Sequence, residues 1–362
     1  MAAPRRSWLV FGFSAEEAAG GPDPGPGPRR LRSGPEGIRR VWPAWSYVVL
    51  ETGAGALEVR GGGGGGGRLP AGCAEALPSE THVVLRRAAA AEAWPRAAAL
   101  RGALRGAPAW RRVLPPDPDP GPGPAPPPLP LLPGGFAAPR PPFFVPLPPA
   151  LRARRLALGH EHVLALGPAG ETYAWGGGRH GQLGHGVLEP EPEPRLVEAL
   201  AGVPMRELAA GGWHSASVSE AGDLYVWGWN ESGQLALPSK ALAEERAQAE
   251  EAGAGDAELT PHREQPGAEG TEFISIQAFP ALLDFPQDLE VSKVSCGSRH
   301  TAAVTRGGEL YTWGWGKYGQ LGHEDNTSSD QQRRVDYLAA NGLRAEDVVC
   351  GPWTTYVCVL EQ

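Results

Sequence analysis

A repeated pattern of glycine, histidine and tryptophan constrains the fold of this chain more than any other feature. Each copy has a glycine three residues before a histidine and a tryptophan sixteen residues after that glycine. A Gly-Gln-Leu triplet begins six residues after the tryptophan. The three copies begin at Gly159, Gly211 and Gly297. Units that recur with fixed spacing bury their apolar sides against one another, as propeller blades or solenoid turns do. The chain is therefore expected to be a repeat scaffold that functions through its surface.

Each copy of the pattern predicts a β-hairpin. In the first copy, residues 162–166 are a short apolar run, residues 167–170 contain a glycine-bearing turn, and residues 171–175 form the returning strand. Because side chains alternate along a strand, Tyr173 and Trp175 are expected on the same face of the sheet. The other two copies repeat this arrangement. Hairpins with large aromatic residues on one face predict sheets that stack against each other.

Weaker copies indicate how the two ends of the chain come together. Residues 350–357 match the first half of a unit, and residues 9–12 resemble the second half. If both ends pair in one blade, they close a ring and leave no long free strand edge. A further degenerate unit spans residues 45–60, with Ser46 in place of the histidine and Arg60 in place of the tryptophan.

The spacing of the units predicts an all-β chain, a single β-propeller over residues 1–362 with about six blades, or with seven. Two insertions are expected to interrupt the ring. Residues 115–149 contain 17 prolines and are expected to be an extended, partly polyproline II tether. Residues 239–272 are predicted to be an acidic, disorder-prone insertion that begins with a helix. A short helix is also predicted over residues 96–105, in a region where a blade is expected but not recognisable.

Charge and hydropathy exclude some classes of function. Residues 1–155 carry 20 arginines against 11 acids, whereas residues 156–362 carry 13 bases against 30 acids. A protein that binds duplex DNA through its phosphates needs a basic stripe, and the repeats are acidic. Direct sequence-specific DNA binding is therefore not expected. No apolar run approaches the roughly 18 residues that span a bilayer, and residues 8–13 are too short for a signal peptide. The sequence predicts a soluble intracellular protein with no membrane contact.

Motifs that could carry chemistry have a simpler structural interpretation. Residues 176–181 match G-x-G-x-x-G after a predicted strand, but the motif recurs with the repeat and leads into Gly-Gln-Leu instead of a helix. The periodic histidines are expected to stabilise the fold by hydrogen bonding. The four cysteines have no C-x-x-C spacing and are expected to be small buried residues. No nucleophile, base or metal motif stands out, so no catalytic, cofactor or metal site is predicted.

The full pattern, G-x-x-H…Y-x-W-G…G-Q-L-G, resembles the repeat of the regulator of chromosome condensation family. The units at 158–185, 210–235 and 296–323 match it nearly in full, and the N-terminal third of the chain matches it poorly. The resemblance implies a β-propeller without a cofactor. The founding member of that family is a guanine-nucleotide exchange factor for the nuclear GTPase Ran, and it docks on nucleosomes. A small member is associated with a JmjC-type Fe(II)/2-oxoglutarate oxygenase that acts on histone lysines, and with chromosome segregation.

This resemblance implies a non-catalytic scaffold that binds a JmjC-type histone lysine demethylase and contacts chromatin or histones indirectly. The expected location is the nucleus, on chromosomes, with the cytoplasm as an additional site. The alternative is guanine-nucleotide exchange on a Ran-like small GTPase, and a ubiquitin-ligase or trafficking adaptor is a third class. The sequence has no counterpart of the exchange factor's protruding wedge, and residues 1–28 hold only two bases, Arg5 and Arg6. Both observations count against exchange and against direct DNA docking.

Residues that differ between the copies are the candidates for contact with a partner. Loops between scaffold strands gather on the rims of a propeller, and tryptophan, tyrosine and arginine are frequent anchors of interfaces. One group of candidates directly precedes the histidine position: Trp213, Arg299 and Trp353. A second group precedes the Gly-Gln-Leu triplet: Arg179, Asn230, Lys317 and Tyr318.

Overall fold

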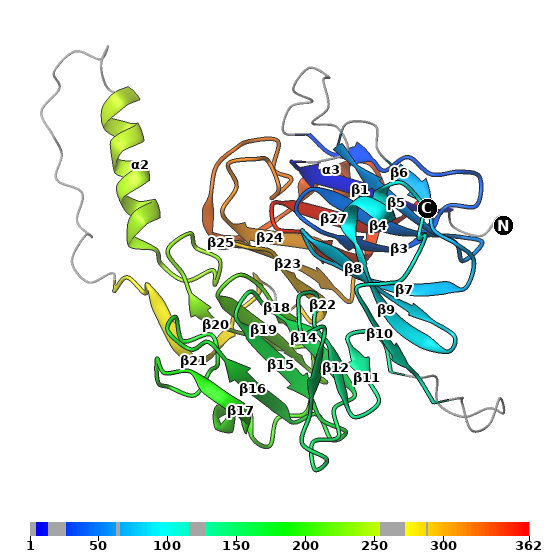
Figure 1. Cartoon of the computed structure of the whole chain (residues 1–362). Coiled ribbons are helices and arrows are strands. Elements are labelled where there is room, and N and C mark those ends of the chain that lie inside the picture. The colour runs from blue at the N-terminus through cyan, green and yellow to red at the C-terminus, as the bar shows by residue number, and fades with distance from the viewer. Residues whose placement is uncertain are drawn as a thin grey trace, which may run out of the picture.

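The computed structural model describes residues 5–13, 27–62, 66–115, 127–253, 272–286 and 289–361. Strands in these ranges form seven antiparallel sheets arranged around a ring, so the fold is a seven-bladed β-propeller (Figure 1). The prediction of an all-β propeller is confirmed. The described residues form seven blades, which is the larger of the two numbers that the repeat spacing predicted.

Blades one to three are built from the N-terminal part of the chain. Blade one contains β3 (Ile38–Pro43), β4 (Tyr47–Thr52), β5 (Leu57–Gly61) and β6 (Gly66–Arg68). Blade two contains β7 (Cys73–Pro78), β8 (His82–Arg87), β9 (Ala90–Pro95) and β10 (Trp110–Val113), with helix α1 (Arg96–Leu100) between its last two strands. Blade three has three short strands, β11 (Leu131–Leu132), β12 (Gly135–Ala137) and β13 (Phe144–Pro146).

Blades four to six are the three clear repeats. Blade four contains β14 (Arg155–Leu158), β15 (His162–Leu166), β16 (Thr172–Gly176) and β17 (Glu191–Leu196), followed by the 3-10 helix η2 (Glu198–Leu200). Blade five contains β18 (Met205–Ala210), β19 (His214–Ser219), β20 (Leu224–Trp229) and β21 (Ile276–Leu283), with helix α2 (Lys240–Gly253) between its last two strands. Blade six contains β22 (Val291–Cys296), β23 (His300–Thr305), β24 (Leu310–Gly314) and β25 (Ser329–Arg334), followed by helix α3 (Asp336–Ala340).

Blade seven joins the two ends of the chain. It contains β26 (Leu343–Cys350), β27 (Thr354–Glu361), β1 (Arg5–Gly12) and β2 (Arg29–Arg30) in the order β2-β1-β27-β26. β1 pairs with β27 over its whole length, and Leu9 lies opposite Val357. This confirms the predicted closure of the ring by the terminal strands, which ties both ends into one sheet.

The predicted hairpins are present in register. His162 pairs with Gly176 across the hairpin of blade four, and His214 pairs with Gly228 in blade five. Gly228 has a φ of 110°, and a Cβ at this position would lie 2.6 Å from the carbonyl oxygen of Trp213. A glycine is required here because the backbone is in the left-handed region and two chain segments approach closely.

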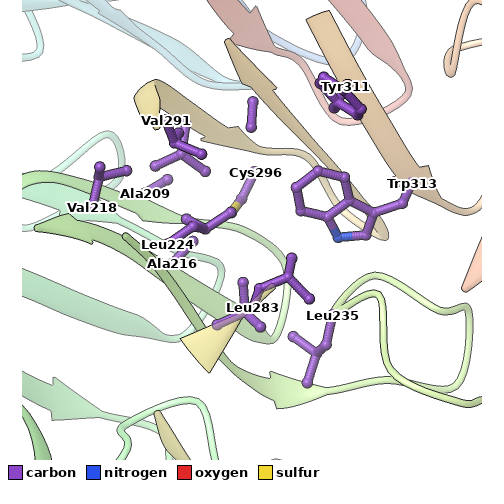
Figure 2. Close-up of a cluster of buried hydrophobic side chains, with 13 residues drawn as sticks. Ala209, Ala216, Val218, Leu224, Leu235, Leu283, Val291, Cys296, Tyr311 and Trp313 are labelled. Carbon is purple, nitrogen blue, oxygen red and sulfur yellow. The ribbon is translucent and has the colours of Figure 1, made fainter. Parts of the chain in front are cut away.

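The core consists of apolar clusters between neighbouring blades. The repeat tryptophans Trp227 and Trp313 are fully buried, and each packs against the blade that precedes its own. Figure 2 shows Trp313 of blade six beside Leu235 and Leu283 of blade five. Since each blade covers its apolar face with the next blade, the ring as a whole is the unit of stability.

The structure corrects the prediction for residues 115–149. We expected a proline-rich tether over this whole stretch, but residues 131–146 contain the three strands of blade three. Residues 116–126 lie outside the described residues. Prolines are compatible with this sheet because its strands are short and Pro146 stands at the end of an outer strand, where a backbone donor is dispensable.

The N-terminal part of the predicted 239–272 insertion is the helix α2, as expected from its sequence. Its first two turns contact blade six. Arg246 forms an ion pair with the buried Asp330 at 2.9 Å, Leu242 is buried, and Lys317 pairs with Glu245. The rest of the helix projects away from the ring (Figure 1). Residues 254–271, to which the predicted disorder applies, lie outside the described residues.

Candidate functional site

The periodic histidines are buried between blades, where they bridge one blade to the next. His162 Nε2 lies 2.8 Å from the Ser215 hydroxyl of blade five. His214 repeats the contact with Thr301 of blade six at 2.9 Å, and His300 repeats it with Thr355 of blade seven at 3.0 Å. The prediction that these histidines stabilise the fold is confirmed by their burial and by these bonds.

The hydroxyl partners fix the protonation of the histidines. The Ser215 hydroxyl donates its only proton to the carbonyl oxygen of Gln182 at 2.7 Å, so it can only accept from His162. This network assigns the proton to Nε2 of the histidine and leaves Nδ1 unprotonated. Burial lowers the pKa of His162 and His214 to about 3 and that of His300 to about 4. All three are therefore neutral at physiological pH and are not available as proton donors or acceptors at a surface.

The Gly-Gln-Leu triplets have a structural role in the same network. The carbonyl oxygen of Gln182 also accepts from the Trp227 indole at 2.9 Å, and that of Gln234 accepts from Trp313 at 2.9 Å. The first two triplets thus present a backbone carbonyl to the tryptophan and the hydroxyl of the next blade. In the third, the Gln320 carbonyl accepts from the Thr355 hydroxyl of blade seven at 2.7 Å. The glycine-rich stretch 176–181 connects β16 to the β17 side of the blade through turns, as the sequence predicted.

One end of the propeller carries a central funnel. All seven blades contribute to this cavity of about 780 Å³. Its wall is formed where the first strand of most blades turns into the second, as at residues 159–161, 211–213, 297–299 and 351–353. Because successive strands are antiparallel, the connections from the third to the fourth strands lie at the same end. We call this end the funnel rim. The charged and aromatic side chains in the wall are Trp45, Glu80, Phe136, Arg140, His160, Glu161, His162, Trp213, Arg299 and Trp353.

Two aromatic clusters occupy the funnel rim. The first joins blades four to six: Trp213 and Trp229 pack edge to face at 5.5 Å, and the His180 ring lies 5.7 Å from both. Arg299 completes it with its guanidinium 4.7 Å from the Trp229 ring centroid. A guanidinium over an indole is held by the ring quadrupole and keeps its donors free for a partner.

The second cluster joins blades one, six and seven. Trp353 is at its centre, with Trp315 at 4.7 Å, Trp45 at 5.5 Å and Tyr318 at 5.9 Å, all in edge-to-face contact. The Phe13 ring lies 6.0 Å from the Tyr318 ring. Trp45 is 52% exposed and Tyr318 is 50% exposed. Rings of this size that are already held in place lose little conformational freedom when a partner covers them.

The structure brings most of the predicted contact residues to this rim. Trp213, Arg299 and Trp353 line the funnel, Tyr318 belongs to the second cluster, and Arg179 is exposed in the connection after β16. Lys317 is also exposed but forms an ion pair with Glu245 of α2. Lys317 therefore links the funnel rim to α2 through this ion pair.

The prediction for Asn230 is corrected. Asn230 is fully buried, and its amide donates to the carbonyl oxygens of Leu237 and Ile274 at 2.9 and 2.8 Å. Its side-chain oxygen accepts from the Leu235 amide at 3.0 Å. The residue holds together the two ends of the long connection that carries α2, so it is not a surface contact.

Several rim and repeat residues were not recognised in the sequence. Trp229 and Trp315 each follow a repeat tryptophan by two residues, and the Trp-Gly-Trp triplet was the available signal. In blade two, His82 pairs with Pro95, and its neighbour Val83 pairs with Trp94, as in the clear repeats. In blade one, Tyr47 and not Ser46 holds the histidine position, because Tyr47 pairs with Gly61 and the Ala44 amide bonds to its carbonyl.

The histidines, cysteines and carboxylates of the described residues do not gather into a metal site. Across these ranges, no group of three or more histidine, cysteine, aspartate or glutamate side chains could hold a metal ion. Burial raises the pKa of Cys350 to about 12 and that of Cys296 well above its usual value, so both are neutral thiols. Of the helices that the structure describes, none has the length and apolar character needed to cross a bilayer.

The comparisons with known proteins agree with the repeat pattern. Models of the regulator of chromosome condensation (RCC1) repeat match residues 169–218, 221–304 and 307–358, just over half of the chain. RCC1 domain-containing protein 1 from Homo sapiens is 50% identical over 371 residues, covering 98% of this chain and 97% of that protein. The protein of the same name from Mus musculus is 46% identical over 340 residues, covering 90% of this chain and 88% of that protein.

The fold is also similar to a solved structure. Prp20p from Saccharomyces cerevisiae superposes with a TM-score of 0.70 at 16% sequence identity, covering 100% of this chain and 93% of that one. At this identity the likeness concerns the fold alone. Because repeat models match over half of the chain and two relatives match 90% or more of it, the chain belongs to the RCC1 repeat family.

Proposed function

We propose that this chain is a non-catalytic interaction scaffold whose funnel rim binds a JmjC-type Fe(II)/2-oxoglutarate histone lysine demethylase. The observation that carries the scaffold proposal is the collection of partly exposed aromatic rings and an arginine at one end of the propeller. The demethylase is the partner implied by the resemblance of the repeats to the small family member. Contact with chromatin or histones would then pass through that partner, in the nucleus.

The physical basis for the proposal is the preorganisation of the rim. Interface energy is concentrated in tryptophan, tyrosine and arginine side chains that lie in desolvated, well-packed surroundings. Trp45, Trp213 and Trp353 are held by edge-to-face contacts in the free chain, so little rotamer entropy remains to be lost on binding. The funnel adds a concave surface into which a loop of the partner can insert.

The proposed mechanism is positioning. The scaffold would hold the oxygenase by its aromatic rim, and the oxygenase would supply the chemistry. The neutral, buried histidines and thiols described above support a structural role for the groups that could otherwise act as acids, bases or nucleophiles.

The test is a binding measurement between the purified chain and a purified JmjC-type histone lysine demethylase by isothermal titration calorimetry. Trp45→Ala removes an exposed ring and is expected to weaken binding at least tenfold, about 1.4 kcal/mol, while the fold is kept. Val113→Ala removes an exposed apolar side chain from the outer strand of blade two and serves as the matched control. Equal affinity of Trp45→Ala and the unchanged chain would contradict the rim as the binding surface.

Exchange activity on a Ran-like small GTPase is the alternative that the family resemblance implies. It is tested by release of a fluorescent guanine nucleotide from such a GTPase in the presence of sub-stoichiometric chain. The scaffold proposal expects a release rate equal to that without the chain. An accelerated release that the Trp45→Ala variant loses would assign the rim to nucleotide exchange instead.

A further inference from the structure

The outer side of the ring carries a second exposed surface, away from the funnel. β21 runs along the outside of blade five, and its residues contact the connection that follows β16 in blade four (Figure 1). Six large apolar side chains here are between 37% and 54% exposed. They are Val187, Leu188, Phe273, Ile276, Phe279 and Leu282. We call this surface the apolar flank. The six side chains together expose on the order of 500 Å², which is close to the area of the largest apolar patch on a typical monomer.

A β-bulge builds the apolar flank. Val226 pairs with Ala281 and Gly228 pairs with Gln277, so three residues of β21 lie opposite Trp227 alone. Phe279 lies in the middle of this bulge, and its ring covers Gly186 of blade four, where no side chain would fit. The Gly186 amide donates to the carbonyl oxygen of Ala278 at 3.0 Å. The apolar side chains are therefore presented by a fixed backbone and not by a loose loop.

The segments of the apolar flank themselves carry charge of one sign. The two segments that form it, residues 181–194 and 272–286, contain no lysine and no arginine. They contain five carboxylates: Glu189, Glu191, Glu193, Glu272 and Asp284. Glu189, Glu193 and Glu272 are exposed, and Glu191 lies 3.8 Å from Arg195. An apolar surface with acidic borders is complementary to a segment that is apolar on one side and basic at its edges.

We propose that the apolar flank is a docking site for an amphipathic, lysine- or arginine-bearing segment of a protein partner. The segment would cover Phe279 and Leu282 with apolar side chains and pair its basic residues with the bordering glutamates. Docking is through side chains and not by addition of a strand, because Pro280 has no backbone donor and the bulge interrupts the edge of β21. None of the six apolar side chains lines the funnel, and the proposal does not depend on the demethylase.

Other occupants fit the surface less well. The insertion over residues 254–271 contains a single large apolar side chain, Leu259, so it could not cover six of them. A second copy of this chain docked symmetrically would place carboxylates against carboxylates. An anionic membrane surface would be repelled by the same carboxylates.

The probe for the test is a labelled helical peptide of about four turns, with leucine along one face and lysine on the other. A second peptide has glutamate in place of every lysine. Fluorescence anisotropy measures the binding of both to the full chain, to Phe279→Ser/Leu282→Ser and to Val113→Ser. Val113 is the matched control, because it is 71% exposed on the outer strand of another blade. Leu188→Ser is a second single variant in case the double variant does not fold, and circular dichroism checks each fold.

The proposal predicts that the lysine peptide binds the unchanged chain and Val113→Ser equally. It predicts at least tenfold weaker binding to the double variant or to Leu188→Ser, and at least tenfold weaker binding of the glutamate peptide. Equal binding of the lysine peptide to the double variant would overturn the proposal, since it would show charge attraction alone. Equal binding of both peptides would overturn the role of the acidic border. A dimer by light scattering that the double variant dissociates would assign the flank to a second copy.

Discussion

The three buried histidines that bridge the blades, His162, His214 and His300, predict how the stability of the chain changes with pH. His214 is fully buried, donates from Nε2 to Thr301 at 2.9 Å, and has its pKa lowered to about 3 by burial. In the unfolded chain the same side chain has a pKa of about 6.5. Between these two values the unfolded state binds a proton that the folded state does not. The free energy of unfolding therefore falls as the pH falls below about 6.5.

The magnitude follows from the interval between the unfolded pKa and the working pH. At about pH 5 the folded His214 is still neutral, while protonation stabilises the unfolded state by about 2 kcal/mol relative to about pH 7.5. His162 and His300 are buried in the same way and contribute similar amounts. Together, the three buried histidines are expected to lower the free energy of unfolding of the chain by roughly 6 kcal/mol over this pH interval.

The test compares His214→Gln with the unchanged chain by urea unfolding at about pH 7.5 and about pH 5. Glutamine removes the titration but can still donate a hydrogen bond. Whatever the substitution costs at neutral pH, that cost should be smaller at about pH 5 by about 2 kcal/mol. His160→Gln is the control, since His160 is exposed, and it should change stability little at either pH. The same cost for His214→Gln at both pH values would refute the assignment of a neutral, buried histidine.

Three further substitutions test other contacts of the fold. Thr301→Val removes the hydroxyl between His214 and the Gln234 carbonyl and should cost about 1–3 kcal/mol in chemical denaturation, whereas Thr301→Ser should cost less. Gly228→Ala forces a side chain into a φ of 110° and should lower stability by about 1–3 kcal/mol or prevent folding, and a neutral effect in the same assay would contradict the structure. Arg246→Ala leaves the buried Asp330 without its ion pair, so hydrogen exchange in α2 should be roughly tenfold faster, with no change in β19.

The sequence predicted the parts of the fold in which spacing is preserved. The hairpins of blades four to six followed from glycine, histidine and tryptophan at fixed intervals, because each is required by a contact between blades. The closure of β1 on β27 followed from the match of residues 350–357 and 9–12 to the two halves of a unit, although Thr354 and Phe11 replace the histidine and the tryptophan. Blade two was not recognised in the sequence because Ser79 replaces the repeat glycine and because the β8–β9 hairpin is one residue shorter than the hairpins of the clear repeats. Blade three escaped because its short strands lie in a stretch whose proline content is typical of tethers.

The candidate site was predicted in part, for reasons that lie in the backbone. The rule that side chains alternate along a strand does not apply beyond Gly228, because the left-handed φ of this residue changes the direction of the chain. Trp229 was therefore not recognised as a rim residue. Asn230 was wrongly placed on the surface because a polar residue in a long connection looks exposed in sequence. The connection needs internal hydrogen bonds to hold its ends together, and Asn230 makes them.

Hydrogen exchange of the chain bound to a JmjC-type histone lysine demethylase tests whether this partner covers the funnel rim. Binding through the funnel rim predicts slower exchange at residues 211–214, 297–300 and 351–354, compared with the free chain. It also predicts unchanged exchange in the turns at the opposite end, at 167–170 and 306–309. Protection confined to those opposite turns, with exchange at the rim unchanged, would show that the partner binds the other end of the propeller.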